Sequence, residues 1–296
     1  MRELLCDTHE RRFQVIHDHQ HYFDIALMCD LLNVSRQGYY DWIDRPASPS
    51  SRQRDRIVQA IRQSHVESHC RYGSPNIHRD LLEQGMGCCL NTVAKRMKEH
   101  GIASIIHRKF RVTTTDSNHD HPVFENRLDR DFAAKAPNQK WAADITYIHT
   151  DEGLLYLAGV VDLFSRKIIG WSMKDTLHTD LCVEALEMAL ANRRPRHPLL
   201  HHSDRGSQYA GKQYQDKLTE FNLDCSMSRV GNCWDNAVVE SLWASLKNEL
   251  VFQRTFATRQ QAKDAVFEWI TVWYNRKRRH SSLGYLSPEA FEAQQN

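Results

Sequence analysis

The sequence predicts a mixed α/β domain in the second half of the chain and all-helical modules before it. From residue 139 onward, three strand-like runs follow one another and then alternate with amphipathic segments. Before that point, apolar residues recur at helical spacing and are interrupted by polar stretches rich in Pro and Ser. Strands that come first and then alternate with helices are typical of a sheet covered by helices.

The composition is that of an ordinary globular protein. The chain has 296 residues, of which 41% are hydrophobic and 26% charged, and its net charge is +2. No apolar run approaches the roughly 18 residues of a membrane span, and the first residues lack the apolar stretch of a signal peptide. We therefore expect a cytoplasmic protein without a membrane segment. Local basic clusters can still neutralise phosphates, and they lie at residues 108–111, 193–196 and 276–279.

The eight cysteines are scattered along the chain, which is typical of reduced thiols in a cytosolic protein. A zinc site formed by His65 and His69 with the adjacent pair Cys88 and Cys89 is an alternative. Adjacent cysteines, however, lack the spacer that lets two thiolates share one tetrahedral ion.

Residues 1–45 are predicted to form a small helix-turn-helix. Regularly spaced apolar residues precede NVSRQGYYDW, in which Ser35 is a suitable N-cap for a second helix. That helix could present Arg36 and Gln37 to DNA. A packing module without groove contact is the alternative. The stretch that follows, RPASPSSRQR, indicates a linker.

Residues 52–106 are predicted to form a second helix-turn-helix unit. One helix begins at Ser74 and stops at Gly85, and another has Asn91 as its N-cap and stops at Gly101. Basic side chains on the last helix could contact DNA phosphates or form a solvated face. These side chains are Lys95, Arg96 and Lys98.

Residues 107–138 are polar with little periodicity, and we expect a connector there. Residues 139–252 are expected to form the α/β domain. Its five strand-like runs are WAADITYIHT, GLLYLAGVVDLF, RKIIGWSM, LLHHS and LDCSMS. Helices are expected from Thr179 to Arg193 and over SQYAGKQYQDKLTEF. Residues 253–296 are expected to be a helical, basic tail.

Three carboxylates of the α/β domain stand in distinctive settings. Asp144 lies inside the strand-like run WAADITYI, Asp204 directly follows the fourth strand in HHSDRGSQY, and Glu240 lies in the helical pattern of GNCWDNAVVESLWASLKNEL. Hard divalent cations take oxygen ligands, and carboxylates on rigid elements can hold two of them about 3.5–4 Å apart. The pattern therefore predicts a two-metal site for phosphoryl transfer.

The predicted helix that carries Glu240 has an apolar stripe on a neighbouring face. The stripe consists of Val239, Trp243, Leu246 and Leu250. Glu240 is rotated by about 100° from Val239, so it can face an adjoining cleft. Lys247 shares the face of Glu240 and could hold a DNA phosphate or be an exposed lysine. Asn236, one turn before Glu240, could orient that carboxylate or cap the helix.

Two further residues of the domain are not needed as ligands or bases. Asp162 follows the second strand, and we expect it to shape the turn there. His202 precedes Asp204, but a catalytic base is unnecessary where a metal ion can lower the pKa of water.

At these residues the chain resembles the OrfB transposases of insertion sequences of the IS-three type, which carry a DDE catalytic domain. The resemblance covers nearly the whole length. Beyond the three acids it includes YLAGVVDLFSRKIIGWSM (156–173) and YNRKRRHSSLGYLSPEAFE (274–292). It implies an RNase H-like catalytic core, similar to that of retroviral integrases, with a mixed five-stranded sheet. It also implies that residues 52–106 are the helix-turn-helix domain that precedes this core.

The resemblance further implies the reaction and its residues. Asp144, Asp204 and Glu240 would be the catalytic metal ligands for two Mg²⁺ or Mn²⁺ ions, and Lys247 matches a basic position of the family. The activity would be cleavage of the insertion-sequence ends followed by strand transfer. In the tail, the expected DNA-backbone contacts are Arg276, Arg278 and Arg279.

The implied partners are double-stranded DNA, both the terminal inverted repeats and the target, and a homo-oligomer formed on that DNA in the nucleoid. An upstream OrfA-type partner or fusion is expected as well, because the sequence has no sustained heptad segment of its own. A stand-alone nuclease of RNase H type would not need the helix-turn-helix modules. A DNA-binding regulator that had lost catalysis would not keep the three acids.

Overall fold

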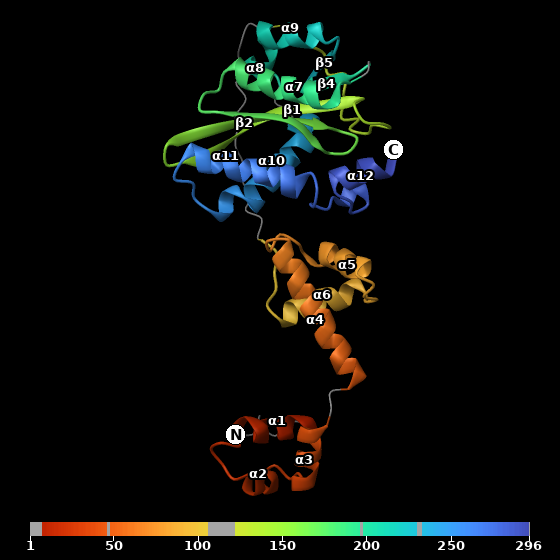
Figure 1. Ribbon diagram of the computed structural model, residues 1–296, viewed down its shortest axis with the longest axis vertical. Helices are drawn as coiled ribbons and strands as arrows, with labels where there is room; N and C mark the ends of the chain where they lie inside the picture. The colour runs from red at the N-terminus through yellow and green to blue at the C-terminus, as the bar shows by residue number, and fades with distance from the viewer. Residues whose placement is uncertain (1–7, 46–47, 106–121, 196–197, 230–232, 296) are drawn as a thin grey trace. The chain divides into compact units, whose positions relative to one another are not determined.

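The computed structural model describes residues 8–45, 48–105, 122–195, 198–229 and 233–295 (Figure 1). The chain divides into two compact units, Met1–Ala60 and Ile61–Asn296. No helix among these described residues is long and apolar enough to cross a membrane.

The first unit contains three short helices, α1 (His9–His19), α2 (Ile25–Leu31) and α3 (Arg36–Asp44), and the start of α4 (Pro49–Glu67). Ser35 caps α3 as predicted, because its hydroxyl accepts a hydrogen bond from the Gly38 N–H at 3.0 Å. The sequence indicated two helices here rather than three. The small core consists of Ile16, Met28, Cys29 and Tyr39.

In the second unit, α5 (Ser74–Glu83) and α6 (Leu90–Glu99) follow the end of α4. Gly85 and Gly101 stand at positive φ just after these two helices, as expected for residues that end a helix. The predicted N-cap at Asn91 is wrong. The helix begins two residues earlier than expected, so Cys89 takes the capping position and Asn91 lies in the first turn.

A mixed five-stranded sheet forms the centre of the second unit. Its strands are β1 (Lys140–Thr150), β2 (Gly153–Asp162), β3 (Ile168–Lys174), β4 (Leu200–Ser203) and β5 (Asp224–Met227). Their order is β3-β2-β1-β4-β5. The first three strands pair antiparallel, whereas β4 and β5 continue the sheet in parallel. This arrangement confirms the five strands that the sequence predicted.

Helices cover both faces of the sheet. Figure 1 shows α7 (Thr179–Arg193), α8 (Ser207–Ala210) and α9 (Lys212–Glu220) on one side and α10 (Ala237–Glu249) and α11 (Arg259–Glu268) on the other. Neighbouring glycines allow this close packing from opposite sides. A Cβ on Gly170 of β3 would meet the Ala185 carbonyl of α7 at 2.2 Å, and one on Gly159 of β2 would meet the Trp243 ring of α10 at 2.6 Å.

The C-terminal segment packs onto the sheet domain. It contains a π-helix (Trp269–Tyr274) and α12 (Pro288–Gln295). Trp273 and Tyr274 are buried, so their rings serve core packing. The Asn275 side chain accepts from the Ile168 N–H at 3.0 Å and donates to the Ile168 carbonyl at 2.9 Å, which attaches the tail to β3.

Candidate active site

Two parallel strands bring Asp144 and Asp204 together. The last paired residues of β1 and β4 are Ala142 and His202. Each aspartate comes two residues after that pair, so both lie on the same face, where β4 ends. Asp204 also accepts a hydrogen bond from the Gly206 N–H at 2.9 Å, which orients its carboxylate at the start of α8.

Glu240 approaches the same place from α10. It lies in the first turn of that helix and is exposed. The apolar stripe predicted for the helix is confirmed, because its four members are all buried: Val239, Trp243, Leu246 and Leu250. Their burial fixes the rotation of α10 against the sheet and leaves the carboxylate of Glu240 outside the core.

The three carboxylates influence one another electrostatically. Burial raises the pKa of Asp144 well above its usual value, and the charges of Asp204 and Glu240 raise it further. Partial burial also raises the pKa of Glu240. Each of these effects disfavours the ionised form of the carboxyl group. A nearby cation would act in the opposite direction and favour the ionised form.

The donor set suits a hard divalent cation, because all three candidate ligands are carboxylates. Within the described part of the chain, no three His, Cys, Asp or Glu side chains are already arranged to hold a metal ion. The residues therefore fit a divalent cation in their chemistry.

Lys247 is buried beside this site rather than exposed. Its side chain lies on α10, and its ammonium is 4.9 Å from the centre of the Tyr147 ring of β1. Burial lowers the pKa of Lys247, whereas the nearby Asp144 carboxylate acts in the opposite direction. This placement disagrees with the alternative of a solvated surface lysine.

Comparison with known proteins identifies the family. Residues 134–233 match the family model described as an integrase core domain, residues 222–288 match a second model of that description, and residues 52–110 match an HTH-like domain. The transposase InsF for insertion sequence IS3A of Escherichia coli (strain K12) is 44% identical over 95% of this chain and 98% of its own. The chain belongs to the IS3-type insertion-sequence transposases. It is a DNA transposase with an integrase-type catalytic core.

A second curated relative is consistent with this family. The uncharacterized 31 kDa protein of insertion element IS600 from Shigella sonnei is 42% identical over 89% of this chain and 97% of its own. A chain of the solved simian T-cell lymphotropic virus intasome, in complex with PP2A regulatory subunit B56 gamma, has 16% identity and a TM-score of 0.47. It covers 79% of this chain and 74% of its own. The family match and the sheet order confirm the RNase H-like class expected from the sequence.

Two residues next to Glu240 hold the transposase site together in ways that the sequence did not reveal. Asn236 donates from its side chain to the Ala143 carbonyl at 3.2 Å, which ties the start of α10 to the strand residue before Asp144. It makes no side-chain cap of the helix. Asp235 is fully buried and pairs with Arg229 at 2.9 Å and with Arg130 at 3.0 Å. No periodicity marks either residue, because Ala143 and Arg130 lie far from them in the sequence.

Asp162 and His202 are structural in the transposase. Asp162 is buried and accepts from the N–H groups of Asn138 at 2.9 Å and Phe164 at 3.0 Å, which confirms the prediction that it shapes a turn. His202 lies between the hydroxyl groups of Ser226 and Ser228, and burial lowers its pKa to about 4. It is therefore neutral at physiological pH.

The predicted DNA contacts of the helical modules lie on their surfaces. Arg36 and Gln37 are exposed in the first turn of α3. Lys95 and Lys98 are exposed on α6, whereas Arg96 is half-buried and pairs with Glu99 at 2.5 Å. The DNA contacts of these five side chains stay predictions.

Two arginines of the basic tail form ion pairs within the transposase. Arg278 donates to Glu249 at 2.8 Å, and Arg279 pairs with Asp80 at 2.8 Å. Both guanidinium groups are therefore engaged by carboxylates of the protein, and their contacts with the DNA backbone stay predictions. Arg276 remains exposed, with its nearest carboxylate at 3.4 Å.

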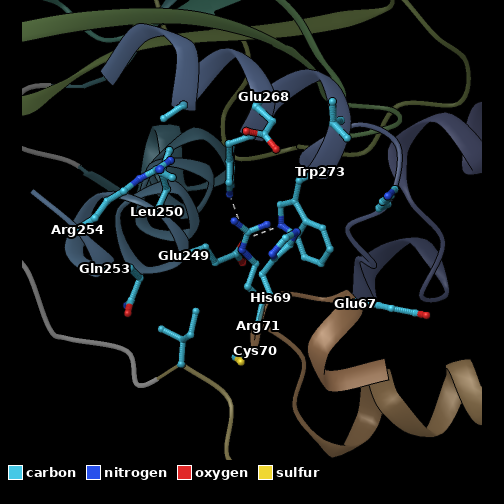
Figure 2. A pocket seen from close by; sticks show the side chains of 15 residues that line it. Glu67, His69, Cys70, Arg71, Glu249, Leu250, Gln253, Arg254, Glu268 and Trp273 are labelled. Atoms are coloured by element: carbon cyan, nitrogen blue, oxygen red, sulfur yellow. Dashed lines mark hydrogen bonds between the residues drawn. The ribbon is translucent and has the colours of Figure 1, made fainter. Parts of the chain in front are cut away.

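A cavity of about 440 Å³ lies where the tail meets the loop after α4 (Figure 2). In it, the Arg71 guanidinium lies 4.6 Å from the centre of the Trp273 ring, and Trp273 donates to Glu249 at 2.8 Å. Glu249 ends α10. The helix that carries Glu240 is thus anchored at its far end by the tail.

Proposed function

We propose that this transposase cleaves the ends of its insertion sequence and transfers the freed strands at a site formed by Asp144, Asp204 and Glu240. The observation that carries the assignment is the shared register of β1 and β4, which sets two aspartates side by side. Glu240 adds a third carboxylate from α10, and its charge acts on Asp144. One site serves both steps, since each breaks one phosphorus–oxygen bond and forms another.

We assign Asp144, Asp204 and Glu240 as ligands of two Mg²⁺ or Mn²⁺ ions. Such ions supply Lewis-acid stabilisation of the attacking and leaving oxygens when bound. The raised pKa of Asp144 means that this carboxyl must lose its proton to become a ligand. Ion binding is therefore expected to release protons and to tighten as the pH rises.

In this proposal the Lys247 ammonium holds a phosphate of the terminal DNA strand. Its burial on α10 gives it one orientation, and the Tyr147 ring supports that orientation from β1. A fixed positive charge near the scissile phosphate stabilises charge that develops during the reaction.

DNA binding is assigned to the helical modules and to the exposed part of the tail. Residues 52–106 would bind the element end, residues 139–252 would carry catalysis, and residues 253–296 would support them. The basic side chains proposed to contact phosphates are Arg36, Lys95, Arg96, Lys98 and Arg276, with Gln37 beside them. Phosphate contacts of this kind weaken steeply as salt increases.

We also propose that a homo-oligomer and an upstream OrfA-type partner assemble on the paired ends. By itself the chain should bind element ends weakly and with a strong dependence on salt. Mixing or fusion with the upstream partner should restore end-specific binding and joining of paired ends. Tight, sequence-specific pairing of both ends by the 296-residue chain alone would contradict this part of the proposal.

The deciding experiment incubates the full chain with its own element ends and Mg²⁺ or Mn²⁺ and follows 3′-end nicking and strand joining. Asp144→Asn, Asp204→Asn and Glu240→Gln should each abolish both products while DNA binding persists. Asp175→Asn is the matched control, because Asp175 is an exposed acid of the same domain. A triad variant with near-normal turnover in Mg²⁺ would exclude that residue from the site.

A further inference from the structure

Trp243 lies against the strand pair that carries Asp144. It stands on α10 one turn after Glu240, and only 4% of its surface is exposed. Gly159 of β2 is the register partner of Asp144. A Cβ on Gly159 would lie 2.6 Å from Cη2 and 3.0 Å from Cζ2 of the indole. The glycine therefore provides the space that lets the indole lie beside Asp144.

The indole N–H of Trp243 has no acceptor with full hydrogen-bond geometry, although it is buried. Asp144 is the carboxylate beside this N–H, because the indole covers Gly159, the register partner of Asp144, and the N–H acts to lower the pKa of that carboxyl. Leaving a buried donor unpaired is energetically unfavourable. A small movement of the Asp144 carboxylate toward the indole would complete this hydrogen bond.

We propose that Trp243 is a positioning residue whose indole N–H donates to the Asp144 carboxylate and fixes the orientation in which Asp144 binds a divalent cation. The proposal rests on the assignment of Asp144 as a ligand. Hydrogen-bond partners of ligand carboxylates typically change metal affinity by about 10- to 100-fold when they are removed. Gly159 is part of the same arrangement, because any larger residue at position 159 would displace the Trp243 indole.

The test compares Trp243→Phe, which removes the N–H and keeps an aromatic ring, with Trp141→Phe. Trp141 is the matched control: it is a fully buried tryptophan of β1, and its N–H also lacks a partner. It packs in the core on the α7 side of the sheet. Mn²⁺ binding to the full chain without DNA is measured from the electron paramagnetic resonance of the free ion, and thermal unfolding checks that each variant folds.

Trp243→Phe should weaken Mn²⁺ binding by about 10-fold or more, and Trp141→Phe should leave it within about 2-fold of the parent. Nicking by Trp243→Phe should recover as the Mn²⁺ concentration is raised, because orientation is lost but no ligand is removed. Unchanged Mn²⁺ affinity in a folded Trp243→Phe protein would overturn the proposal.

Gly159→Ala separates hydrogen bonding from packing. Alone, it should weaken Mn²⁺ binding by displacing the indole. Combined with Trp243→Phe, it should leave the affinity as low as in Trp243→Phe, whereas a purely steric role predicts recovery once the shorter ring relieves the clash. If Asp144→Asn leaves Mn²⁺ binding unchanged, the assignment of Asp144 as a ligand fails. If Asp144→Asn weakens Mn²⁺ binding but the Trp243 variants leave it unchanged, only the positioning role of Trp243 fails.

Discussion

Arg279 and Asp80 form an ion pair at 2.8 Å although they are 199 positions apart in the sequence. The Arg279 guanidinium also donates to Glu83, and the backbone N–H of Arg279 donates to the Tyr72 hydroxyl. A residue in a basic run thus joins the tail to α5 and to the segment before it.

We expect Arg279→Ala to lower the free energy of unfolding by roughly 1–3 kcal/mol, because it leaves a partly buried carboxylate without its charged donor. Urea unfolding of Arg279→Ala, Asp80→Ala and the double variant measures their coupling, which should be favourable. Arg276→Ala is the control: its side chain is 64% exposed, so it should weaken DNA binding and leave stability unchanged. An Arg279→Ala protein of normal stability whose DNA affinity falls as far as that of Arg276→Ala would contradict this structural role and favour a contact between Arg279 and the DNA backbone.

Lys247→Ala should reduce nicking, but less than loss of any of the three acids, because the ammonium positions phosphate and holds no cation. Lys247→Arg should recover part of the rate, since the charge remains while the larger guanidinium must fit a buried position. The measurement is the single-turnover nicking rate at saturating Mg²⁺. Lys212→Ala, which removes an exposed lysine of the same domain, should show the parental rate. Equal rates for Lys247→Ala and the parent at physiological salt would remove Lys247 from the site.

Asp144→Asn should stabilise the metal-free protein at neutral pH. The folded protein holds a proton on Asp144 at pH values where the unfolded chain, with an aspartate pKa near 3.9, has lost it. Between those two pKa values the stability of the parent falls as the pH rises, because the native state binds more protons than the unfolded state. Asparagine imitates the neutral acid and removes this loss. Thermal unfolding in EDTA from pH 4 to pH 8 should show a gap between variant and parent that widens with pH, and a constant gap would contradict the raised pKa.

Gly170→Ala should be strongly destabilising, by more than the roughly 1–3 kcal/mol of ordinary overpacking. Its new methyl group would lie 2.2 Å from the Ala185 carbonyl and 2.5 Å from the Ala189 nitrogen, and both belong to the backbone of α7. Gly87→Ala is the control, because nothing lies within 4 Å of the corresponding position. Similar thermal stability for the two variants would mean that α7 does not approach β3 this closely.

Local patterns in the sequence determined most of the fold. The predicted helix from Thr179 to Arg193 is α7, with the same ends, and the five strand-like runs became the five strands. Apolar spacing reports the face that an element buries, and this information lies within a few residues. For the same reason the buried stripe of α10 and the turn made by Asp162 could be predicted without coordinates.

The sequence by itself also selected Asp144, Asp204 and Glu240 from the 37 acidic residues, through their motifs. Only the tertiary structure decided what surrounds them: Lys247 buried beside the acids, Trp243 over Gly159, and Arg278 and Arg279 paired within the protein. A charged or polar side chain looks the same in the sequence whether it meets solvent, DNA or a carboxylate 199 positions away. Its partner is set by the packing of distant elements, because burial makes pairing obligatory where water would otherwise satisfy the group.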